Sequence, residues 1–256
     1  MQSLLLFLLV FYCVFPLSAQ PTNYLYQLFD QALIQSRQGS FGEALVVWDS
    51  LIDYCPDNPS VWSNRGNTKL ALGDLKGALD DHSESIRLEP NQRDAYLNRG
   101  VVEERLRLWP QAAVDYERII DKNPFDSEAL YNLANVEGAL GNWSNAQAYY
   151  NRAALARPDF AMAISSQALA TYQLDEFDIS EAKLLKLIKR YPLLADARAS
   201  LVIILYHLNL YGEAKSHWAA VVGLDSRYQQ VEWLLNIRRW PKQPTLDLME
   251  FIRSIE

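Results

Sequence analysis

The stretch SEALYNLANVEGALGNWSNAQAYYNRAALARP, residues 127–158, decides the fold of this chain. Apolar residues recur at helical spacing in its first half, which therefore predicts an amphipathic helix. Gly141 and Asn142 interrupt that pattern, because glycine takes a left-handed backbone at no steric cost and asparagine tolerates it. A second amphipathic helix is expected from Trp143 until Pro158, which has no N–H to continue it. Neither helix can bury its apolar stripe alone, so the pair needs neighbours of the same kind.

The same pattern recurs along the chain with a period of 34 residues. Prolines end five units, at Pro56, Pro90, Pro124, Pro158 and Pro192. Alanines precede four of these prolines by 12 residues, at Ala44, Ala78, Ala112 and Ala146. Small residues precede all five by 24 residues, at Ala32, Gly66, Gly100, Ala134 and Ala168. Bulky residues recur near each turn, at Phe41, Leu75, Trp109, Trp143, Phe177 and Tyr211. Small residues let helices cross closely, and the bulky ones fill the space that remains.

This combination of period, small residues and terminal prolines resembles the tetratricopeptide repeat. The resemblance covers residues 24–226 as six units and implies an all-α, right-handed superhelical solenoid of helix-turn-helix pairs. Residues 227–239 are expected to form a capping helix over the last apolar face. Residues 240–256 predict a linker and a short amphipathic tail helix, capped at Thr245. We expect the tail to pack on the cap, and the alternative is that it reaches a partner.

Two units depart from the pattern. In repeat five the segment QLDEFDIS contains the turn, and Ala182 lies two positions later than the period requires. We interpret this as a lengthened turn followed by a shortened second helix. Repeat six has Val202 where a small residue is expected and Ser226 in place of proline, as suits a terminal unit.

An apolar run, LLLFLLVFYCVFPL, occupies residues 4–17 and is followed by small residues. It predicts that residues 1–19 are a signal peptide cleaved after Ala19, or an uncleaved membrane anchor, although no Lys or Arg precedes the run. In either case the chain is expected to be exported or membrane-anchored. After cleavage Cys55 would be the only cysteine left, and we expect it to be a small core residue rather than a reactive thiol.

Composition and spacing argue against several classes of function. Half of the residues are apolar and the net charge is −7, which is ordinary for a folded chain and unsuited to binding nucleic acid. The three histidines, His82, His207 and His217, lack the spacing of metal ligands. No phosphate-binding glycine loop or nucleophile elbow is present, so we predict no catalytic residues, no cofactor and no metal, and not an enzyme. His82 stands where other units carry Trp or Tyr, so we expect it to pack in the core.

A basic stripe lies on one side of the second helix of repeat five, at Lys183, Lys186, Lys189 and Arg190. The simpler interpretation is the solvated face of an amphipathic helix. The alternative is a contact with acidic lipid headgroups or with an acidic partner.

The resemblance also implies a function. The first helices of such a solenoid line a concave groove that binds peptides or proteins, so we expect a non-catalytic protein-binding scaffold or assembly factor. The phrases WSNRG and AYLNRG resemble repeat proteins of cyanobacteria and plastids. This resemblance implies a role in membrane complex (photosystem-type) assembly, in the thylakoid lumen or periplasm. The alternatives are a structural, self-associating protein and an accessory subunit of a larger complex.

Projection of the first helices onto the concave face of the family gives the candidate groove residues: Asn67, Leu97, Val101, Arg105, Tyr131, Asn135, Met162, Leu169, Tyr172, Ile203 and Tyr206. Tyr131, Tyr172 and Arg105 are the expected anchors, because binding energy concentrates in buried aromatic and Arg side chains. The alternative for Tyr206 is packing against the cap. Gly138 and Ala139 are expected to leave space in the middle of the groove.

Some proteins of this family grip the acidic tails of heat-shock chaperones with a clamp of two Lys, one Arg and two Asn. Here Asn67 and Asn98 match the two Asn positions, whereas the cationic positions hold Ser63, Glu128 and Asn132. Because Glu128 would repel a carboxylate, we predict that the chain does not bind such tails.

Overall fold

The structure is a computed structural model that describes residues 22–255, with side chains from Tyr24 onward. The predicted signal peptide or anchor lies outside the described residues. No described helix is long and apolar enough to cross a membrane.

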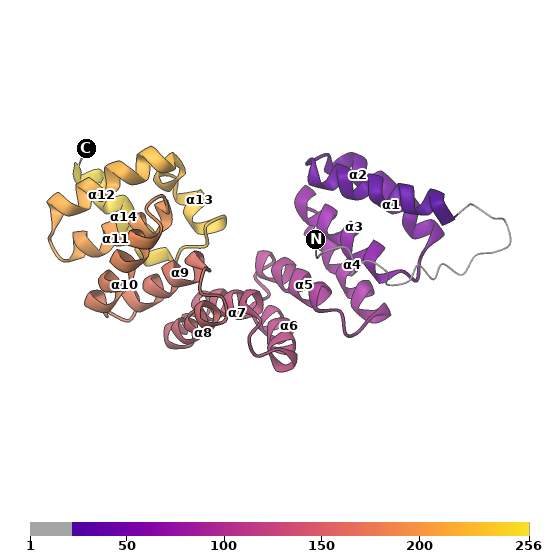
Figure 1. Ribbon diagram of the computed structural model, residues 1–256, viewed down its shortest axis with the longest axis horizontal. Helices are drawn as coiled ribbons and strands as arrows, with labels where there is room; N and C mark the ends of the chain where they lie inside the picture. The colour runs from indigo at the N-terminus through magenta and orange to yellow at the C-terminus, as the bar shows by residue number, and fades with distance from the viewer. Residues whose placement is uncertain (1–21, 256) are drawn as a thin grey trace. The chain divides into compact units, whose positions relative to one another are not determined.

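Twelve of the helices form six pairs in chain order (Figure 1). The first helices of the pairs are α1 (Thr22–Arg37), α3 (Pro59–Leu72), α5 (Arg93–Arg105), α7 (Ser127–Ala139), α9 (Ala161–Tyr172) and α11 (Ala195–His207). The second helices are α2 (Phe41–Tyr54), α4 (Leu75–Leu88), α6 (Trp109–Lys122), α8 (Trp143–Ala156), α10 (Phe177–Arg190) and α12 (Tyr211–Leu224). The fold is the expected all-α solenoid of helix pairs.

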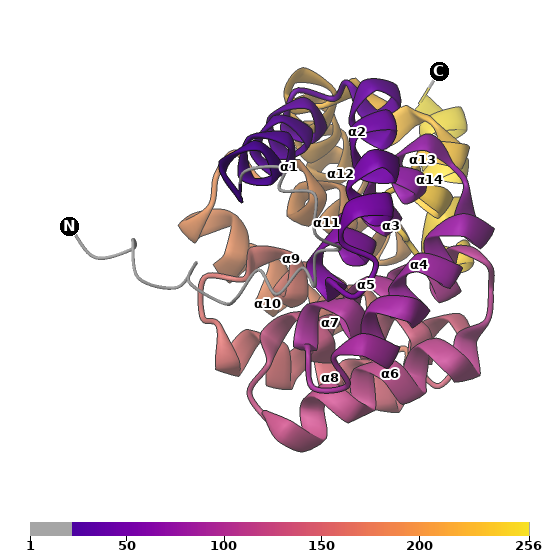
Figure 2. The same cartoon turned by 90° about the vertical axis from the view of Figure 1, so that its right-hand side faces the viewer.

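The chain divides into two compact units whose boundary falls inside α6. Unit 1 is Met1–Asp115 and unit 2 is Tyr116–Glu256. Within unit 1, α1 packs on α2, α2 on α3, and α3 on α4, as Figure 2 shows. Unit 2 repeats this order from α7 to α12. Within each unit, these helices thus bury their apolar stripes against their neighbours, which a single pair could not do.

Every pair closes its turn in the same way. One residue in each turn, one to three positions after the first helix ends, has a positive φ: Gly39, Gly73, Arg107, Gly141, Asp175 and Asn209. The N–H that follows bonds back to the carbonyl five residues earlier in all six turns, for example from Asp74 to Lys69 at 2.9 Å. This is the Schellman closure of a helix end, and it requires a left-handed residue at one position only.

The interpretation of repeat five was right about the turn and wrong about the second helix. The turn has four residues, 173–176, against two or three in the other pairs, and Asp175 takes the left-handed position that glycine fills in three of them. Its second helix, α10, has 14 residues, as α8 has. Ser180, rather than the later Ala182, occupies the small-residue position, where its hydroxyl donates to the Ala168 carbonyl at 2.7 Å. Serine is nearly as small as alanine, so the 34-residue spacing of small residues is unchanged although serine takes the place of alanine here.

Unit 1 combines an apolar core with buried charges. Trp48, Leu51 and Val61 are fully buried between α1, α2 and α3. Cys55 belongs to this core, as expected, but it is disulfide-bonded rather than a lone thiol. The other cysteine of the chain, Cys13, lies outside the described residues.

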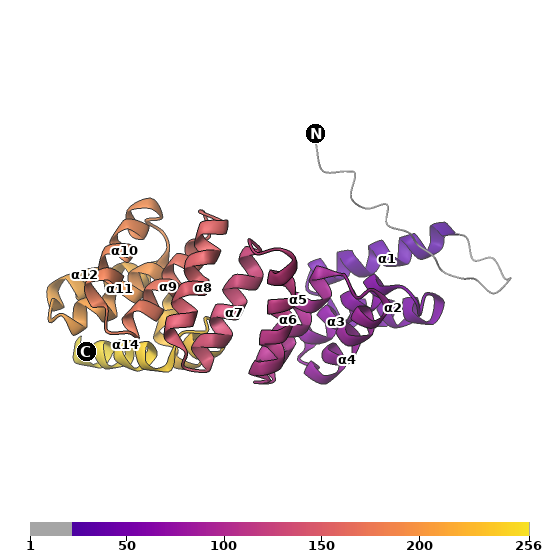
Figure 3. The ribbon, with the colours of Figure 1, turned by 90° about the horizontal axis from the view of Figure 1, so that it is seen from below.

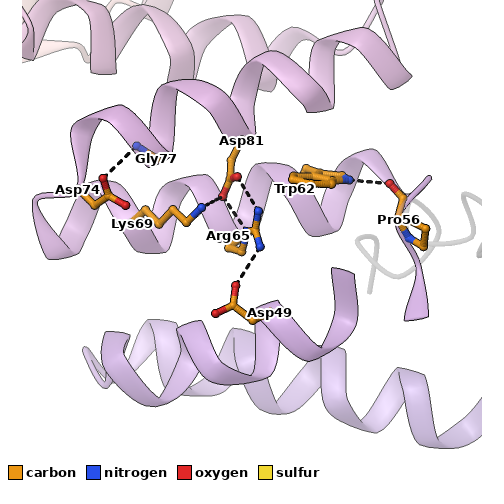
Figure 4. A network of polar contacts seen from close by, with 8 residues as sticks. All are labelled: Asp49, Pro56, Trp62, Arg65, Lys69, Asp74, Gly77 and Asp81. Atoms are coloured by element: carbon orange, nitrogen blue, oxygen red, sulfur yellow. Dashed lines mark hydrogen bonds and ion pairs between the residues drawn. The ribbon is translucent and has the colours of Figure 1, made fainter. Parts of the chain in front are cut away.

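Charged bridges join successive helices of unit 1. Arg65 on α3 donates to Asp81 on α4 at 2.8 Å and to Asp49 on α2 at 2.9 Å, and Lys69 also reaches Asp81 at 2.9 Å (Figure 4). One period later, Arg99 on α5 donates to Asp115 at 2.7 Å. Asp81 and Asp115 are buried and paired, as a carboxylate removed from water must be, whereas Asp49 is exposed.

His82 packs in the core of unit 1, as predicted. Its side chain is fully buried, and its ring lies 2.9 Å from the point where a Cβ on Gly66 would be. Glycine is therefore needed at this crossing. Burial lowers the pKa of His82 to about 4, with a smaller contribution from Arg99, while Asp81 acts in the opposite direction.

The predicted capping helix is not one helix. The chain forms a 3-10 turn, η1 (Ser226–Gln229), and a short helix, α13 (Val231–Asn236), and then bends through Arg239, which has a φ of 57°. The last helix, α14 (Lys242–Ile255), begins before Thr245, whose hydroxyl donates to the Pro241 carbonyl at 2.9 Å. Thr245 is thus inside the first turn rather than at the cap.

The bend follows from one buried carboxylate, Asp196, in the first turn of α11. It accepts hydrogen bonds from Tyr228 at 2.9 Å, Trp240 at 2.9 Å and Ser165 at 2.5 Å, and it pairs with Arg238 at 2.6 Å. Burial raises the pKa of Asp196, but Arg238 and these donors outweigh it and hold the pKa below its usual value. A continuous helix over residues 227–239 could not bring three of these donors to one point.

Candidate protein-binding surface

The candidate groove residues of unit 1 remain accessible. Asn67 on α3 and Arg105 on α5 are exposed, while Leu97 and Val101 are half-buried. The Nη1 atom of Arg105 lies 3.5 Å from the carbonyl oxygen of Leu70. Arg105 therefore reaches from α5 back to α3, and its guanidinium has donors left for a partner.

In unit 2, Tyr131 is partly used by the fold. Its ring packs 4.9 Å from that of Phe160 and 5.5 Å from that of Tyr150, and its hydroxyl lies 3.4 Å from the Ser166 hydroxyl. Asn135 accepts a hydrogen bond from Tyr150 at 2.7 Å. Met162, at the start of α9, is half-buried. These side chains support the joint between α7, α8 and α9, and only part of their surface faces solvent.

The C-terminal part of the candidate groove is filled by the chain itself. Helix α14 packs along α11 (Figure 3), with Leu248 and Phe251 fully buried. Leu169 and Ile203 lie in the same core cluster, 2 % and 0 % exposed. These two residues could contact a partner only if α14 moved away. The tail therefore packs, as expected, but on α11 as well as on α13.

Two tyrosines bind α14 through their hydroxyl groups. Tyr172 is 7 % exposed and donates to Asp247 at 2.7 Å. Tyr206 donates to Glu250 at 3.3 Å, and its ring lies 5.6 Å from that of Phe251. Burial, followed by the bond to Asp247, raises the pKa of Tyr172, so its hydroxyl stays a proton donor. Tyr206 thus packs against the tail helix α14, rather than against residues 227–239 as the alternative to a role in binding had it.

An open cleft remains where α14 begins. It has a volume of about 560 Å³ and is lined by Gly138, Ala139, Gly141, Trp143, Gln173, Lys242, Gln243 and Leu246. The space expected at Gly138 and Ala139 is therefore present. A Cβ on Gly138 would lie 2.8 Å from the Trp143 ring, so glycine is what lets this ring form a wall. Trp143 and Leu246 supply apolar surface, Lys242 supplies a cation, and Gln173 and Gln243 supply amides.

The residues at the cationic clamp positions do not replace the missing charges. Ser63 is 8 % exposed, and Glu128 is exposed, with one oxygen 3.7 Å from Arg157. Binding of an acidic chaperone tail thus stays predicted to be absent. Among residues 22–255 no group of three or more His, Cys, Asp and Glu residues could hold a metal.

The Tetratricopeptide repeat model matches residues 64–127 and 97–161 of this chain. Residues 64–161 of the chain therefore carry tetratricopeptide repeats, and the helix pairs on both sides of this segment continue the same helix-turn-helix unit.

Similar proteins agree with this class. A TPR repeat-containing thioredoxin of Arabidopsis thaliana is 32% identical over 73 residues, which is 28% of this chain and 11% of the relative. The chain spans about a tenth of the curated relatives it matches. A tetratricopeptide repeat protein of Parabacteroides merdae superposes with a TM-score of 0.67 at 19% identity, covering 92% of this chain and 86% of that one. YrrB, described as a TPR protein with an unusual peptide-binding site, gives 0.55 at 16% identity, covering 70% and 92%.

Sequence reasoning missed two features of this surface. It did not foresee that α14 lies over the last first helix, because an amphipathic tail has no signal for the face it will cover. It also missed Asp196. An acidic residue within the apolar sequence of α11 could have indicated a buried carboxylate with several polar partners.

Proposed function

We propose that the chain is a non-catalytic protein-binding scaffold that holds a segment of a partner in the cleft beside α14. The observation that carries this proposal is the cleft itself, which joins apolar walls to a cation and two amides within one small volume. Such a combination suits recognition of a peptide segment, in which an apolar side chain gives affinity and polar groups give orientation.

The chemistry of the lining indicates the kind of segment. An apolar or aromatic side chain would lie between Trp143 and Leu246, and a neighbouring carboxylate would pair with Lys242. Leu169, Tyr172 and Ile203 do not take part while α14 is in place, so Tyr172 is no longer an expected anchor.

Site-specific photo-crosslinking tests this proposal. A benzophenone amino acid at Ala139 in the cleft should capture a defined partner in the native host. The control is the same amino acid at Ala148, an exposed alanine on α8 outside the cleft lining. Lys242→Glu should weaken the capture at position 139. Equal capture at both positions, or capture unaffected by Lys242→Glu, contradicts the proposal.

Self-association is the alternative function, and one measurement separates the two. A scaffold for another protein should sediment as one species over a wide range of concentrations. A structural, self-associating protein should gain mass as its concentration rises, with no need for a second protein.

We also propose that the chain is exported or membrane-anchored, in a thylakoid lumen or periplasm, and that it assists assembly of a membrane complex of the photosystem type. The apolar run at residues 4–17 and the Asn-Arg-Gly phrases support this proposal. N-terminal sequencing of the native protein tests the first part, since a chain that starts at Met1 or Gln2 in a soluble cytosolic fraction contradicts export. Loss of the complex on native gels after deletion of the gene would support the second part.

A further inference from the structure

The outward face of α10 differs from that of the other second helices in its charge. It carries four basic residues, and its two acidic residues, Asp178 and Glu181, both lie in its N-terminal half. The C-terminal half is therefore purely basic, in a chain whose net charge is −7. This concentration of one sign on one helix end produces a local positive potential.

Exposed apolar side chains stand among these cations. Leu185 is 47 % exposed, and Leu193, just after the helix, is 79 % exposed. Lys186 and Lys189 are exposed on the same arc of the helix. We call Leu185, Lys186, Lys189, Arg190 and Leu193 the basic apolar patch. A solvated helix face explains the lysines, and the two leucines add apolar surface directly beside them.

The preceding repeat also exposes an apolar side chain on a second helix that carries no acidic residue. On α8, Leu155 is 72 % exposed and occupies the position equivalent to Lys189, one period earlier. Helix α8 contains Arg152 and no acidic residue. By contrast, α2 in unit 1 exposes Val46 to 67 % beside three acidic residues and no basic one. Helices α2 and α8 thus expose apolar side chains in different electrostatic surroundings.

We propose that the basic apolar patch binds the surface of an anionic lipid membrane. Lysine side chains can reach the phosphate level while leucine side chains insert below the headgroups, which is how amphipathic helices lie in a bilayer interface. An acidic protein would suit the lysines equally, but it would not need isolated leucines that project beside them. Arg190 takes part less, because its Nη1 atom already lies 3.3 Å from the Pro158 carbonyl and its guanidinium covers the Tyr191 ring.

The test must report on α10 itself, because the apolar run near the N-terminus could bind vesicles independently. A fluorescent amino acid is placed at Leu193 in the full chain, and its quenching by nitroxide-labelled headgroups is measured. The vesicles are phosphatidylcholine alone or with about a third phosphatidylserine. We expect quenching that depends on phosphatidylserine and weakens when ionic strength rises from about 0.1 to 1 M, because the Debye length falls from about 10 to 3 Å.

Two variants complete the experiment. Lys186→Glu/Lys189→Glu should abolish the quenching that depends on phosphatidylserine, since each cation contributes about fivefold to binding. The matched control places the fluorescent amino acid at Val46 on acidic α2, where no such quenching is expected. Circular dichroism verifies that all variants are folded. Quenching that is equal in both vesicle types, absent in both, or unchanged in the double variant overturns the proposal, and absence in both would indicate a protein-binding or merely solvated face.

Discussion

The two units use the same repeat position in different ways. The first-helix position that carries Arg65 and Arg99 in unit 1 carries Leu133, Gln167 and Leu201 in unit 2. The facing second-helix position carries Asp81 and Asp115 in unit 1, and Tyr149, Lys183 and His217 in unit 2. Unit 1 therefore joins its helices with ion pairs to buried carboxylates, whereas unit 2 has no carboxylate at these positions.

Unit 2 concentrates its buried charge at one place instead. Asp196 binds α9, η1 and the segment before α14 together through four partners. The difference shows that the repeat specifies which positions meet, while the chemistry at those positions is free to change. It also predicts that charge substitutions affect unit 1 moderately at several sites and unit 2 severely at one.

The largest effect is expected for Asp196→Ala. Removal of the carboxylate leaves Arg238 buried without its partner, which costs about 3–5 kcal/mol of unfolding free energy. Hydrogen exchange should show faster opening of amides in α11, α13 and α14, with unit 1 much less affected. Asp225→Ala is the control, because Asp225 pairs with Arg227 and caps η1 locally, and among the described residues its carboxylate makes no bond to α9 or α11. Equal effects of the two substitutions would show that Asp196 is not a hub.

In unit 1, the unfolding free energy is expected to fall by about 3 kcal/mol as the pH drops from about 6.5 to 4. The pKa of His82 is about 4 in the fold, against about 6.5 when unfolded. Below pH 6.5 the unfolded chain binds a proton that the folded chain does not, so stability falls as the pH drops from 6.5 to 4. His82→Tyr should remove this loss, because Tyr116 fills the equivalent position one repeat later. Urea unfolding at several pH values measures it.

The titration of Glu103 changes stability with pH in the opposite direction, so its contribution must be separated from that of His82. Burial raises its pKa to about 7, with Asp115 adding to the rise and Arg99 opposing it. The folded chain therefore holds a proton that the unfolded chain loses above about pH 4.5, and stability falls as the pH rises toward 7. The His82→Tyr comparison is best made in a Glu103→Gln background. A pH profile unchanged by His82→Tyr in that background contradicts the assignment.

A smaller effect, about 2 kcal/mol, is expected for Asp81→Ala, which leaves Arg65 and Lys69 without their shared carboxylate. Both cations are partly exposed and can turn to water, so the loss should be less than at Asp196. The double variant Asp81→Leu/Arg65→Met should cost less than the single one, because it removes both charges. Denaturation with unit-specific hydrogen exchange measures both. A double variant that is worse than Asp81→Ala would mean that packing, rather than charge, dominates here.

The sequence predicts the parts of this molecule that repeat. Period, helix ends and the small residue at each crossing are read directly, because each must satisfy the same local geometry six times. The errors lie where one residue type stands in for another, as Ser180 does in repeat five, or where the chain leaves the repeat. The course of residues 227–255 depends on Asp196, thirty residues before the segment begins. A local sequence pattern does not show a contact between residues so far apart in the chain. The sequence therefore could not predict that α14 covers the C-terminal end of the candidate groove.

The smallest change in stability is expected for substitutions in the turns, with one turn taken from each unit. Arg107 in unit 1 and Asp175 in unit 2 have a φ of 60°, where glycine stands in three other turns. A left-handed conformation costs a residue with a Cβ about 1 kcal/mol, and less for Asp, whose short side chain bonds locally. Arg107→Gly should therefore stabilise the protein by about 1 kcal/mol, and Asp175→Gly by less. Gly73→Ala should destabilise by a similar amount, which controls for the turn geometry. If Arg107→Gly lowers the midpoint of urea unfolding, then the arginine side chain contributes contacts that outweigh the strain of its backbone.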